Sequence, residues 1–241
     1  MNEPWLSSLG FAIGGYLIGS VSFARLVFAL KRPRKTIPVL RTPTTDGQAA
    51  LVAHAVGATN VMLAFGSRWG LLTTLMDVLK GLIPVLVLRM ILPDSIAAYV
   101  CGIGILVGHL WPVWYRFVGG GGNSSIMGMH FAISPIGMLV TQSIGMMIGR
   151  RYPMVAFLGG IVLAIPWMMV QFGLLSAETW FALILAVIYV IGQLPEAMQI
   201  RQLRRNGHQL DFGYVMRQMK SASSSPANPL ETENPHDRSA R

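Results

Sequence analysis

The sequence predicts an all-α integral membrane protein, because apolar residues are abundant, charged residues are scarce and the apolar residues form long runs. Of the 241 residues, 53% are hydrophobic and 12% are charged, against roughly 45–50% and about 25% in soluble domains. Basic residues gather beside the apolar runs, as they do in the cytoplasmic loops of membrane proteins. We expect five full spans plus short or re-entrant elements, about seven membrane helices in all, with the N-terminus outside and the C-terminus cytoplasmic.

The net charge of +9 does not indicate nucleic-acid binding, because the cations follow the ends of the apolar runs. The clusters are residues 31–41, Arg150 with Arg151, and residues 201–220. This placement fits attraction to the anionic surface of a membrane, so membrane lipids are the expected surroundings. Cys101 is the single cysteine, which excludes an internal disulfide and a cysteine metal cluster.

Residues 6–30 form the first expected span, since a bilayer crossing takes about 20 apolar residues. Small residues within this stretch favour close helix packing. Residues 49–65 are apolar but short, and they contain His54, Thr59 and Asn60. Polar groups in so short a segment favour an interfacial or re-entrant element over a full span.

The other expected spans follow from the same criterion: residues 70–92, 96–114, 153–174 and 178–194. Residues 125–148 are also apolar but are interrupted at Ser134-Pro135. A helical hairpin there keeps Arg150 and Arg151 on the cytoplasmic side, whereas a single kinked span would place them outside. We therefore predict the hairpin.

The chain divides by composition into three expected regions. Residues 1–200 form the membrane domain, and residues 201–220 form a basic, partly helical interfacial segment. Residues 221–241 are rich in Ser, Pro and Asn, which predicts a disordered tail.

The most distinctive stretch is residues 108–125, where Gly-His and an aromatic belt precede four glycines and Asn-Ser-Ser. Asn and Ser accept hydrogen bonds from the free N–H groups of a starting helix. Glycines let the backbone approach a ligand closely, and the helix dipole favours an anion there. We interpret Gly119 to Gly122, with Ser124, as a phosphate or carboxylate site; the alternative is a flexible loop with an ordinary N-cap.

Other polar residues lie in apolar surroundings. Asp77 and Lys80 are three apart, so they share a helix face and can pair. Ionisable groups inside a bilayer usually serve a function, although a structural ion pair remains the alternative. His109 is suited to general acid–base work or, when protonated, to anion binding, with a structural role as the alternative. Asn60 and Thr59 need polar partners in an apolar segment.

Four short motifs follow one another along the chain: Tyr16-Leu17-Ile18-Gly19-Ser20, Gly57-Ala58-Thr59-Asn60-Val61, Asp77-Val78-Leu79-Lys80-Gly81 and Gly108-His109-Leu110-Trp111-Pro112. In this order they resemble the bacterial membrane glycerol-3-phosphate acyltransferases that use acyl phosphate, the PlsY family. Arg151-Tyr152 is also similar, and the resemblance covers roughly residues 10–207. It implies a seven-helix protein of the bacterial cell membrane that moves an acyl group from acyl phosphate to glycerol 3-phosphate. The product is lysophosphatidic acid, for phospholipid synthesis, and neither metal nor cofactor is needed.

The resemblance also implies roles for individual residues. His109 and Asn60 are the expected catalytic residues, which orient groups or move protons. Asp77 is expected to hold the polar core together. The expected substrate-binding residues are Ser20, Thr59, Lys80, Gly119, Gly120, Gly121, Gly122 and Ser124.

Several residues depart from the family pattern. Ala49 stands where an Arg is expected, and residues 52–55 lack the polar side chains of Gly-Ser-Gly-Asn. Neither Val118 nor Gly121 is the Lys that the family loop carries, and Glu196 and Gln199 replace an expected His and Asn. These changes remove cations and donors that would hold two phosphate-bearing substrates.

These departures keep two other functions open. One is a relative that has lost catalysis but still binds lipid or assists another enzyme of lipid synthesis. The other is a small transporter, suggested by the re-entrant elements and by Asp77 with Lys80, and disfavoured because the sequence contains no inverted repeat.

Overall fold

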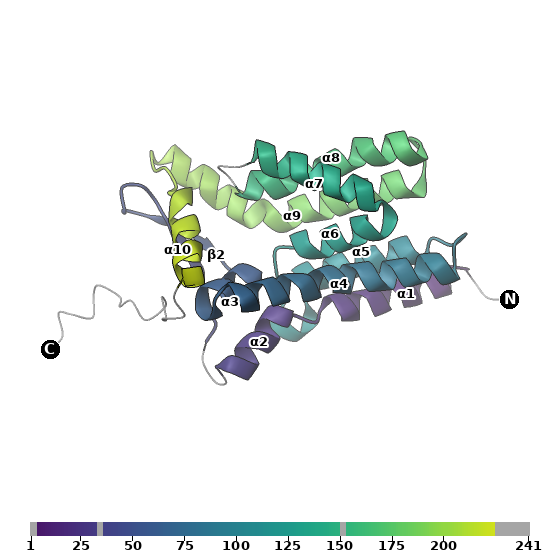
Figure 1. The fold of residues 1–241 in the computed structure, drawn as a ribbon, viewed down its shortest axis with the longest axis horizontal. Coiled ribbons are helices and arrows are strands. Elements are labelled where there is room, and N and C mark those ends of the chain that lie inside the picture. The colour runs from purple at the N-terminus through teal and green to yellow at the C-terminus, as the bar shows by residue number, and fades with distance from the viewer. Residues whose placement is uncertain (1–3, 33–35, 150–152, 225–241) are drawn as a thin grey trace.

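The computed structural model describes residues 4–32, 36–149 and 153–224, and in them the chain is a helical bundle elongated along one axis (Figure 1). The helices are α1 (Pro4–Gly19), α2 (Phe23–Lys31), α3 (Ala58–Phe65), α4 (Ser67–Ile91), α5 (Ala97–Leu110), α6 (Asn123–Ile133), α7 (Pro135–Ile148), α8 (Pro153–Phe172), α9 (Ala177–Arg205) and α10 (Phe212–Ser224). A short 3-10 turn covers Val113–Tyr115, and the strands are β1 (Leu40–Pro43) and β2 (Ala50–Ala53).

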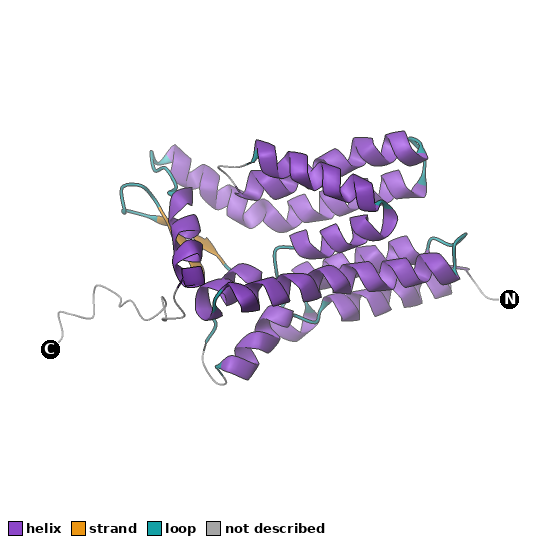
Figure 2. Cartoon of the chain, viewed as in Figure 1, coloured by secondary structure: helices purple, strands orange, loops and turns teal. Residues whose placement is uncertain are grey.

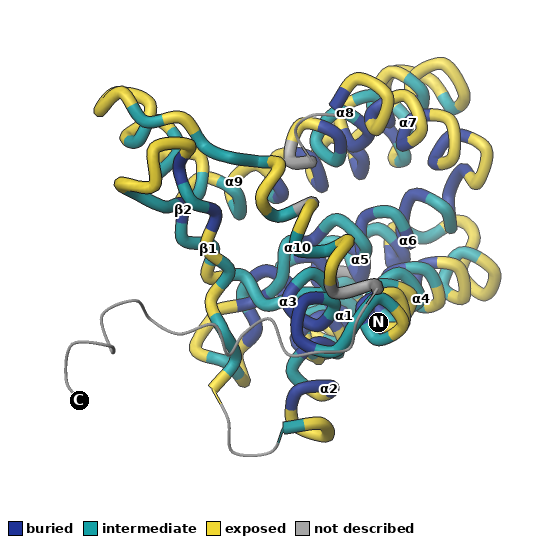
Figure 3. The backbone as a smooth tube through the Cα atoms, turned by 60° about the vertical axis from the view of Figure 1, so that its left-hand side comes forward, coloured by how far each residue is buried: buried dark blue, intermediate teal, exposed yellow. Residues whose placement is uncertain are grey.

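Hydropathy and length confirm the membrane fold. The described residues include five helical segments that are long and apolar enough to cross a bilayer: Ser7–Lys31, Ser67–Ile91, Ala97–Tyr115, Val155–Phe172 and Ala177–Arg205. Many large apolar side chains point outward, and Figure 3 shows exposed turns along the outer sides of α4, α7 and α8. Such side chains suit a hydrocarbon surrounding rather than water.

The first span, which we predicted over residues 6–30, is present but consists of two helices. α1 ends at Gly19, and α2 begins at Phe23. Ser22 caps α2, because its hydroxyl accepts a hydrogen bond from the Arg25 backbone N–H at 3.4 Å. The break does not show in the hydropathy, because the apolar run continues through it.

Residues 49–65, which we expected to form an interfacial or re-entrant element, are not one continuous element. They contain the strand β2 and then α3, a helix of 8 residues. β2 pairs antiparallel with β1, with Leu40 opposite Ala53 and Pro43 opposite Ala50. Figure 2 shows this small hairpin, the only strands in the described residues, at the end of the bundle beside α9 and α10. Whether it lies at the membrane surface stays a prediction.

The hairpin's outer edges are both occupied by other parts of the chain. The Gln199 side chain on α9 donates to the Val52 carbonyl and accepts from the Val52 N–H, each at 3.2 Å. On the β1 side, the Asp211 N–H donates to the Pro43 carbonyl at 2.9 Å, and the Thr45 N–H donates to the Gln209 carbonyl at 2.7 Å. These contacts join the hairpin to the end of α9 and the segment before α10.

The helical hairpin predicted over residues 125–148 is confirmed. α6 ends at Ile133, and the Ser134 hydroxyl caps α7 by accepting from the Gly137 N–H at 3.2 Å. Pro135 occupies the first turn of α7, where its missing N–H costs nothing. The two helices meet at the same end of the bundle as the N-terminus (Figure 1). Arg150, Arg151 and Tyr152, which entered the prediction, lie outside the described residues.

One core holds most of the bundle together, and α4, α5, α6, α8 and α9 all contribute to it. Its fully buried members include Val85, Leu106, Ile126, Met168 and Leu185. α1 packs beside α5, where Gly15 and Gly19 lie against backbone atoms of Cys101 and Ile105. The small residues predicted to permit close helix packing therefore do so.

The division into regions at residue 200 stays a prediction. α9 runs without interruption to Arg205, and α10 then covers α3 and β1. Of the expected disordered tail, residues 225–241 lie outside the described residues.

Candidate functional site

A buried polar cluster lies where α1, α4, α5 and α6 meet. Asp77 and Lys80 come from α4, His109 from the end of α5 and Ser125 from the first turn of α6. The Lys80 ammonium lies 3.0 Å from Asp77 Oδ1 and 2.8 Å from His109 Nδ1. His109 Nδ1 is 3.7 Å from Asp77 Oδ1 and 3.4 Å from Ser125 Oγ. The predicted pair of Asp77 and Lys80 is therefore present, and His109 joins it.

Lys80 also accounts for the break in the first span. Its ammonium donates to the Gly19 carbonyl at 3.2 Å and to the Val21 carbonyl at 2.9 Å. The last carbonyls of a helix have no partner within that helix and carry partial negative charge, so a buried cation stabilises them. With these oxygens, Asp77 and His109 around it, Lys80 has no N–H left over for a ligand. Ser20, at this break, is fully buried.

The contact with Lys80 sets the proton position on His109. An ammonium group can only donate, so Nδ1 of His109 must accept and the ring proton lies on Nε2. A Cβ atom added to Gly120 would lie 2.4 Å from that Nε2, so the imidazole edge abuts the glycine loop. His109 thus directs an N–H toward the loop backbone.

The glycine loop, residues 119–122, is held in place by surrounding segments. The Gly120 N–H donates to the His109 carbonyl at 3.0 Å, and the Val56 N–H donates to the Gly119 carbonyl at 2.8 Å. The Gln193 side chain donates to the Gly121 carbonyl at 3.1 Å. The loop is therefore an ordered structure, which argues against the alternative of a flexible connector.

The start of the helix after the loop differs in detail from the prediction. α6 begins at Asn123 as expected, but the N-cap is Gly122, whose φ of 85° falls in the left-handed region that favours glycine. No side chain caps the helix. Ser124 is half-buried in the first turn, and its neighbour Ser125 is the residue that lies against His109. The two serines are adjacent in the sequence, and only their positions around the helix determine which one faces His109.

A cavity of about 170 Å³ opens beside the loop. Gly119, Gly120 and Trp111 line one side, and His54, Glu196 and Gln199 are among its other lining residues. His109 is not itself a lining residue: its imidazole lies behind the cavity wall, against Gly120. Within the residues that the structure describes, no group of His, Cys, Asp and Glu side chains is assembled as a metal site would require.

Asn60 lies apart from the His109 cluster in its hydrogen bonding. Its Oδ1 accepts from the Gly57 N–H at 3.0 Å, and its Nδ2 donates to the Pro38 carbonyl at 3.2 Å. Asn60 therefore stabilises the first turn of α3 and joins it to the segment before β1. Thr59 is half-buried on the same turn. Their expected roles toward substrate stay predictions.

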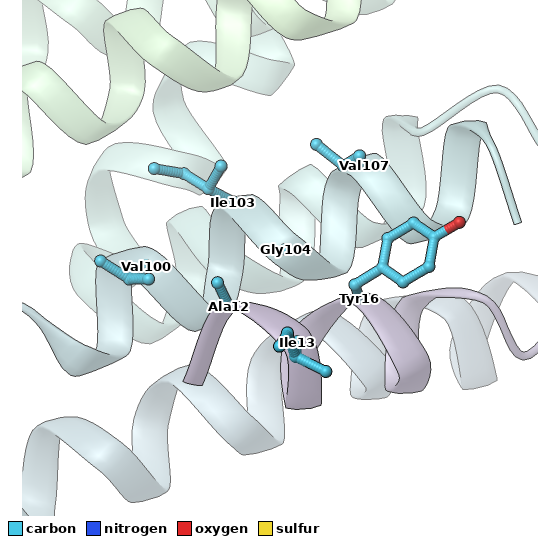
Figure 4. Close-up of a pocket in the computed structure, with 7 residues that line it drawn as sticks. All are labelled: Ala12, Ile13, Tyr16, Val100, Ile103, Gly104 and Val107. Atoms are coloured by element: carbon cyan, nitrogen blue, oxygen red, sulfur yellow. The ribbon is translucent and has the colours of Figure 1, made fainter. Parts of the chain in front are cut away.

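A second cavity, of about 350 Å³, lies between α1 and α5 and is almost wholly apolar (Figure 4). Ala12, Ile13, Val100 and Val107 are among its lining residues. The hydroxyl of Tyr16, which also lines it, donates to the Trp111 carbonyl at 2.9 Å. This lining contains no charged group, so it offers no counter-charge to a phosphate.

Comparison with known proteins gives one consistent family. A family model described as glycerol-3-phosphate acyltransferase matches residues 41–204. The glycerol-3-phosphate acyltransferase of Geotalea daltonii is 34% identical over 138 residues, which are 57% of this chain and 64% of the relative. That of Herminiimonas arsenicoxydans is 35% identical over 133 residues, 54% of this chain and 59% of the relative. The matched segments thus span about three fifths of these relatives.

Solved structures agree over more of the chain. The crystal structure of PlsY (YgiH), an integral membrane glycerol 3-phosphate acyltransferase, in its glycerol 3-phosphate form has a TM-score of 0.66 and 26% identity. The likeness covers 85% of this chain and 95% of that one. The lysophosphatidic acid form has a TM-score of 0.68 at the same identity, and the likeness covers 88% and 99% of the two chains.

Proposed function

Since this chain belongs to the glycerol-3-phosphate acyltransferase family, we propose that it transfers an acyl group from acyl phosphate to glycerol 3-phosphate. The reaction would take place in the cavity beside the glycine loop. The single observation that carries this proposal is the neutral His109, whose Nε2–H is fixed by Lys80 and faces Gly120. A hydrogen-bond donor held in this way suits an oxygen that gains negative charge during acyl transfer.

The chemistry needs positioning more than activation, because acyl phosphate is already an activated donor. The hydroxyl of glycerol 3-phosphate attacks the acyl carbon, the bond from that carbon to the phosphate oxygen breaks, and the hydroxyl proton ends on the released phosphate. No covalent intermediate with the protein is required when the reacting groups are held close together. Loop N–H groups and the His109 Nε2–H would hold the phosphate and the acyl oxygen.

A second candidate function is that the protein keeps the binding site but does not catalyse acyl transfer. It is favoured by Val118 and Gly121, since neither supplies the cation that the family resemblance expects in the loop. Backbone N–H groups alone bind phosphate less strongly than they do beside a cation. The chain would then bind lipid or assist another enzyme of lipid synthesis.

The test is acyl transfer by the full chain purified in detergent, with palmitoyl phosphate and labelled glycerol 3-phosphate. We expect labelled lysophosphatidic acid from the natural chain and at least about a 100-fold loss in His109→Ala, which removes a transition-state donor. Thermal unfolding of both proteins checks that the variant is folded. A folded natural chain that binds glycerol 3-phosphate but forms no product would contradict the proposal and favour the second candidate.

A further inference from the structure

A cation from the first span lies against the glycine loop, although the loop itself contains no lysine. Arg25, on α2, donates through Nη2 to the carbonyl of Val118 at 2.8 Å. Val118 lines the cavity and directly precedes Gly119. The residues are 93 positions apart in the chain, so only the fold brings them together.

The guanidinium is fixed in place and still has donors to offer. Its central carbon lies 4.6 Å from the centre of the Tyr115 ring, a cation–π contact that helps to hold the group in place. Nε is buried and has no hydrogen-bond partner within the described residues. An arginine has five N–H donors, and the contact with Val118 uses one Nη2 donor.

We propose that Arg25 is the phosphate-binding cation of this site. It takes the part that a loop lysine would play, and its guanidinium pairs with a phosphate oxygen of the substrate at the rim of the cavity. This inference rests on the proposed function, because it concerns the same cavity and the same anionic substrates. Arginine suits the role, since its planar group can donate two parallel hydrogen bonds to a phosphate.

Other cations compete for this role, and the structure separates them. Lys31 is on the same helix but lies 4.1 Å from the Trp69 ring, so it stacks elsewhere. The Lys80 ammonium already donates to the Gly19 and Val21 carbonyls and pairs with Asp77. Arg116 is close to the loop in sequence, but it is exposed and makes no hydrogen bond, ion pair or ring contact within the described residues.

The experiment measures binding of glycerol 3-phosphate and of inorganic phosphate to the full chain in detergent by calorimetry. We expect Arg25→Gln to weaken both by about tenfold or more, since a charge-assisted contact is lost. Arg25→Lys should retain part of the affinity. Lys31→Gln is the matched control, because it removes one positive charge and one cation–π contact from the same helix, and it should bind as the natural chain does.

A rescue variant distinguishes phosphate binding from support of the loop. The double variant Arg25→Gln with Val118→Lys places an ammonium group beside the site of the Arg25 guanidinium. It should restore the affinity for phosphate and the dependence of that binding on salt. Unchanged binding in Arg25→Gln would overturn the inference, as would a loss confined to Arg116→Gln. Binding that depends on Arg25 in a chain without turnover would reject the proposed function and keep this inference. A natural chain that binds neither anion would reject both.

Discussion

Gly120 is the residue where the proposed chemistry tolerates least change. We expect Gly120→Ala to lower acyl transfer by about 100-fold, because its Cβ would lie 2.4 Å from His109 Nε2 and displace the donor. Gly121→Ala is the control: the nearest atom to its Cβ is Asn123 Nδ2 at 4.0 Å. Turnover and melting temperature are measured for both. Full activity in Gly120→Ala would mean that His109 does not contact the reacting groups.

Lys80 and Asp77 should act on stability as a unit. Lys80→Met leaves the Asp77 carboxylate buried without its cation and the carbonyls of Gly19 and Val21 without a donor. Losing one partner of a buried ion pair costs about 3–5 kcal/mol. Adding Asp77→Asn to this variant should recover part of the loss in thermal unfolding, and a purely additive double variant would contradict the pairing.

The candidate site was predictable residue by residue only in part. Asp77, Lys80 and His109 were identified because ionisable groups are rare in apolar runs, and the structure brings them together. The contact of Arg25 with Val118 could not be predicted, since nothing in a sequence pairs residues 93 positions apart. Asn60 has a helix-capping role that the motif alone does not reveal.

Among the elements, α1 and α5 are in close contact along their glycines. A Cβ on Gly15 would lie 2.2 Å from the Cys101 carbonyl oxygen, so Gly15→Ala forces the helices apart. We expect it to destabilise the protein by about 1–3 kcal/mol, as overpacking does. Gly14→Ala is the matched control, since no atom lies within 4 Å of the added Cβ. It should be neutral or stabilising by up to about 1 kcal/mol through helix propensity. Equal melting temperatures would contradict this packing.

Asp46 stabilises the turn between β1 and β2 through hydrogen bonds to its carboxylate. Hydrogen bonds from Thr44 at 2.5 Å and from His208 at 2.7 Å lower the pKa of the Asp46 carboxyl below its ordinary value of 3.8. A lowered folded-state pKa stabilises the contact above pH 3.8, and this stabilisation is lost as the pH falls through the folded-state pKa.

Asp46 therefore stays ionised from pH 8 to about pH 5, and we expect its contribution to the stability of the turn to be constant over this range. Asp46→Asn at pH 7 should speed amide hydrogen exchange in residues 44–49 and 206–211 and leave the helical core unchanged. Exchange in the natural chain that already rises between pH 7 and pH 5 in these segments would show that another group fastens the turn.

At the scale of the whole molecule, the two ends of the bundle differ in charge. The connections α4–α5, α6–α7 and α8–α9 lie at the end that holds the N-terminus, and the β-hairpin, α3 and α10 lie at the other (Figure 1). Arg41 lies on β1, and Arg201, Arg204 and Arg205 lie in the last turns of α9, where the Gln199 side chain contacts β2. The positive-inside rule therefore predicts that the hairpin end is cytoplasmic.

Cysteine labelling tests this orientation. Cys101 is buried, so a Cys101→Ala chain gives a clean background. An impermeant maleimide should label Asp94→Cys in intact cells and Gln48→Cys only after the cells are opened, since both positions are exposed at opposite ends. The reverse pattern would invert the predicted topology.

Hydropathy was sufficient to predict the spans, because membrane helices need long apolar runs. The α6–α7 hairpin needed the interruption at Pro135 together with the positive-inside rule. Hydropathy could not predict the break after Gly19, which depends on Lys80 from another helix. Nor did it identify β1 and β2. Strands of 4 residues are too short for an alternating pattern to be recognised in the sequence. They are also held by contacts from Gln199 and Asp211, which are distant in the chain.

Those contacts also affect how copies of the chain meet one another. A bare strand edge is a template on which a second chain can add its own strand and begin aggregation. Here the Gln199 amide occupies the backbone groups of Val52 on one edge, and residues 209–211 occupy the other. Copies crowded together in a bilayer therefore meet no open hydrogen-bonding edge at these positions. Removing the amide, as in Gln199→Leu, would create one.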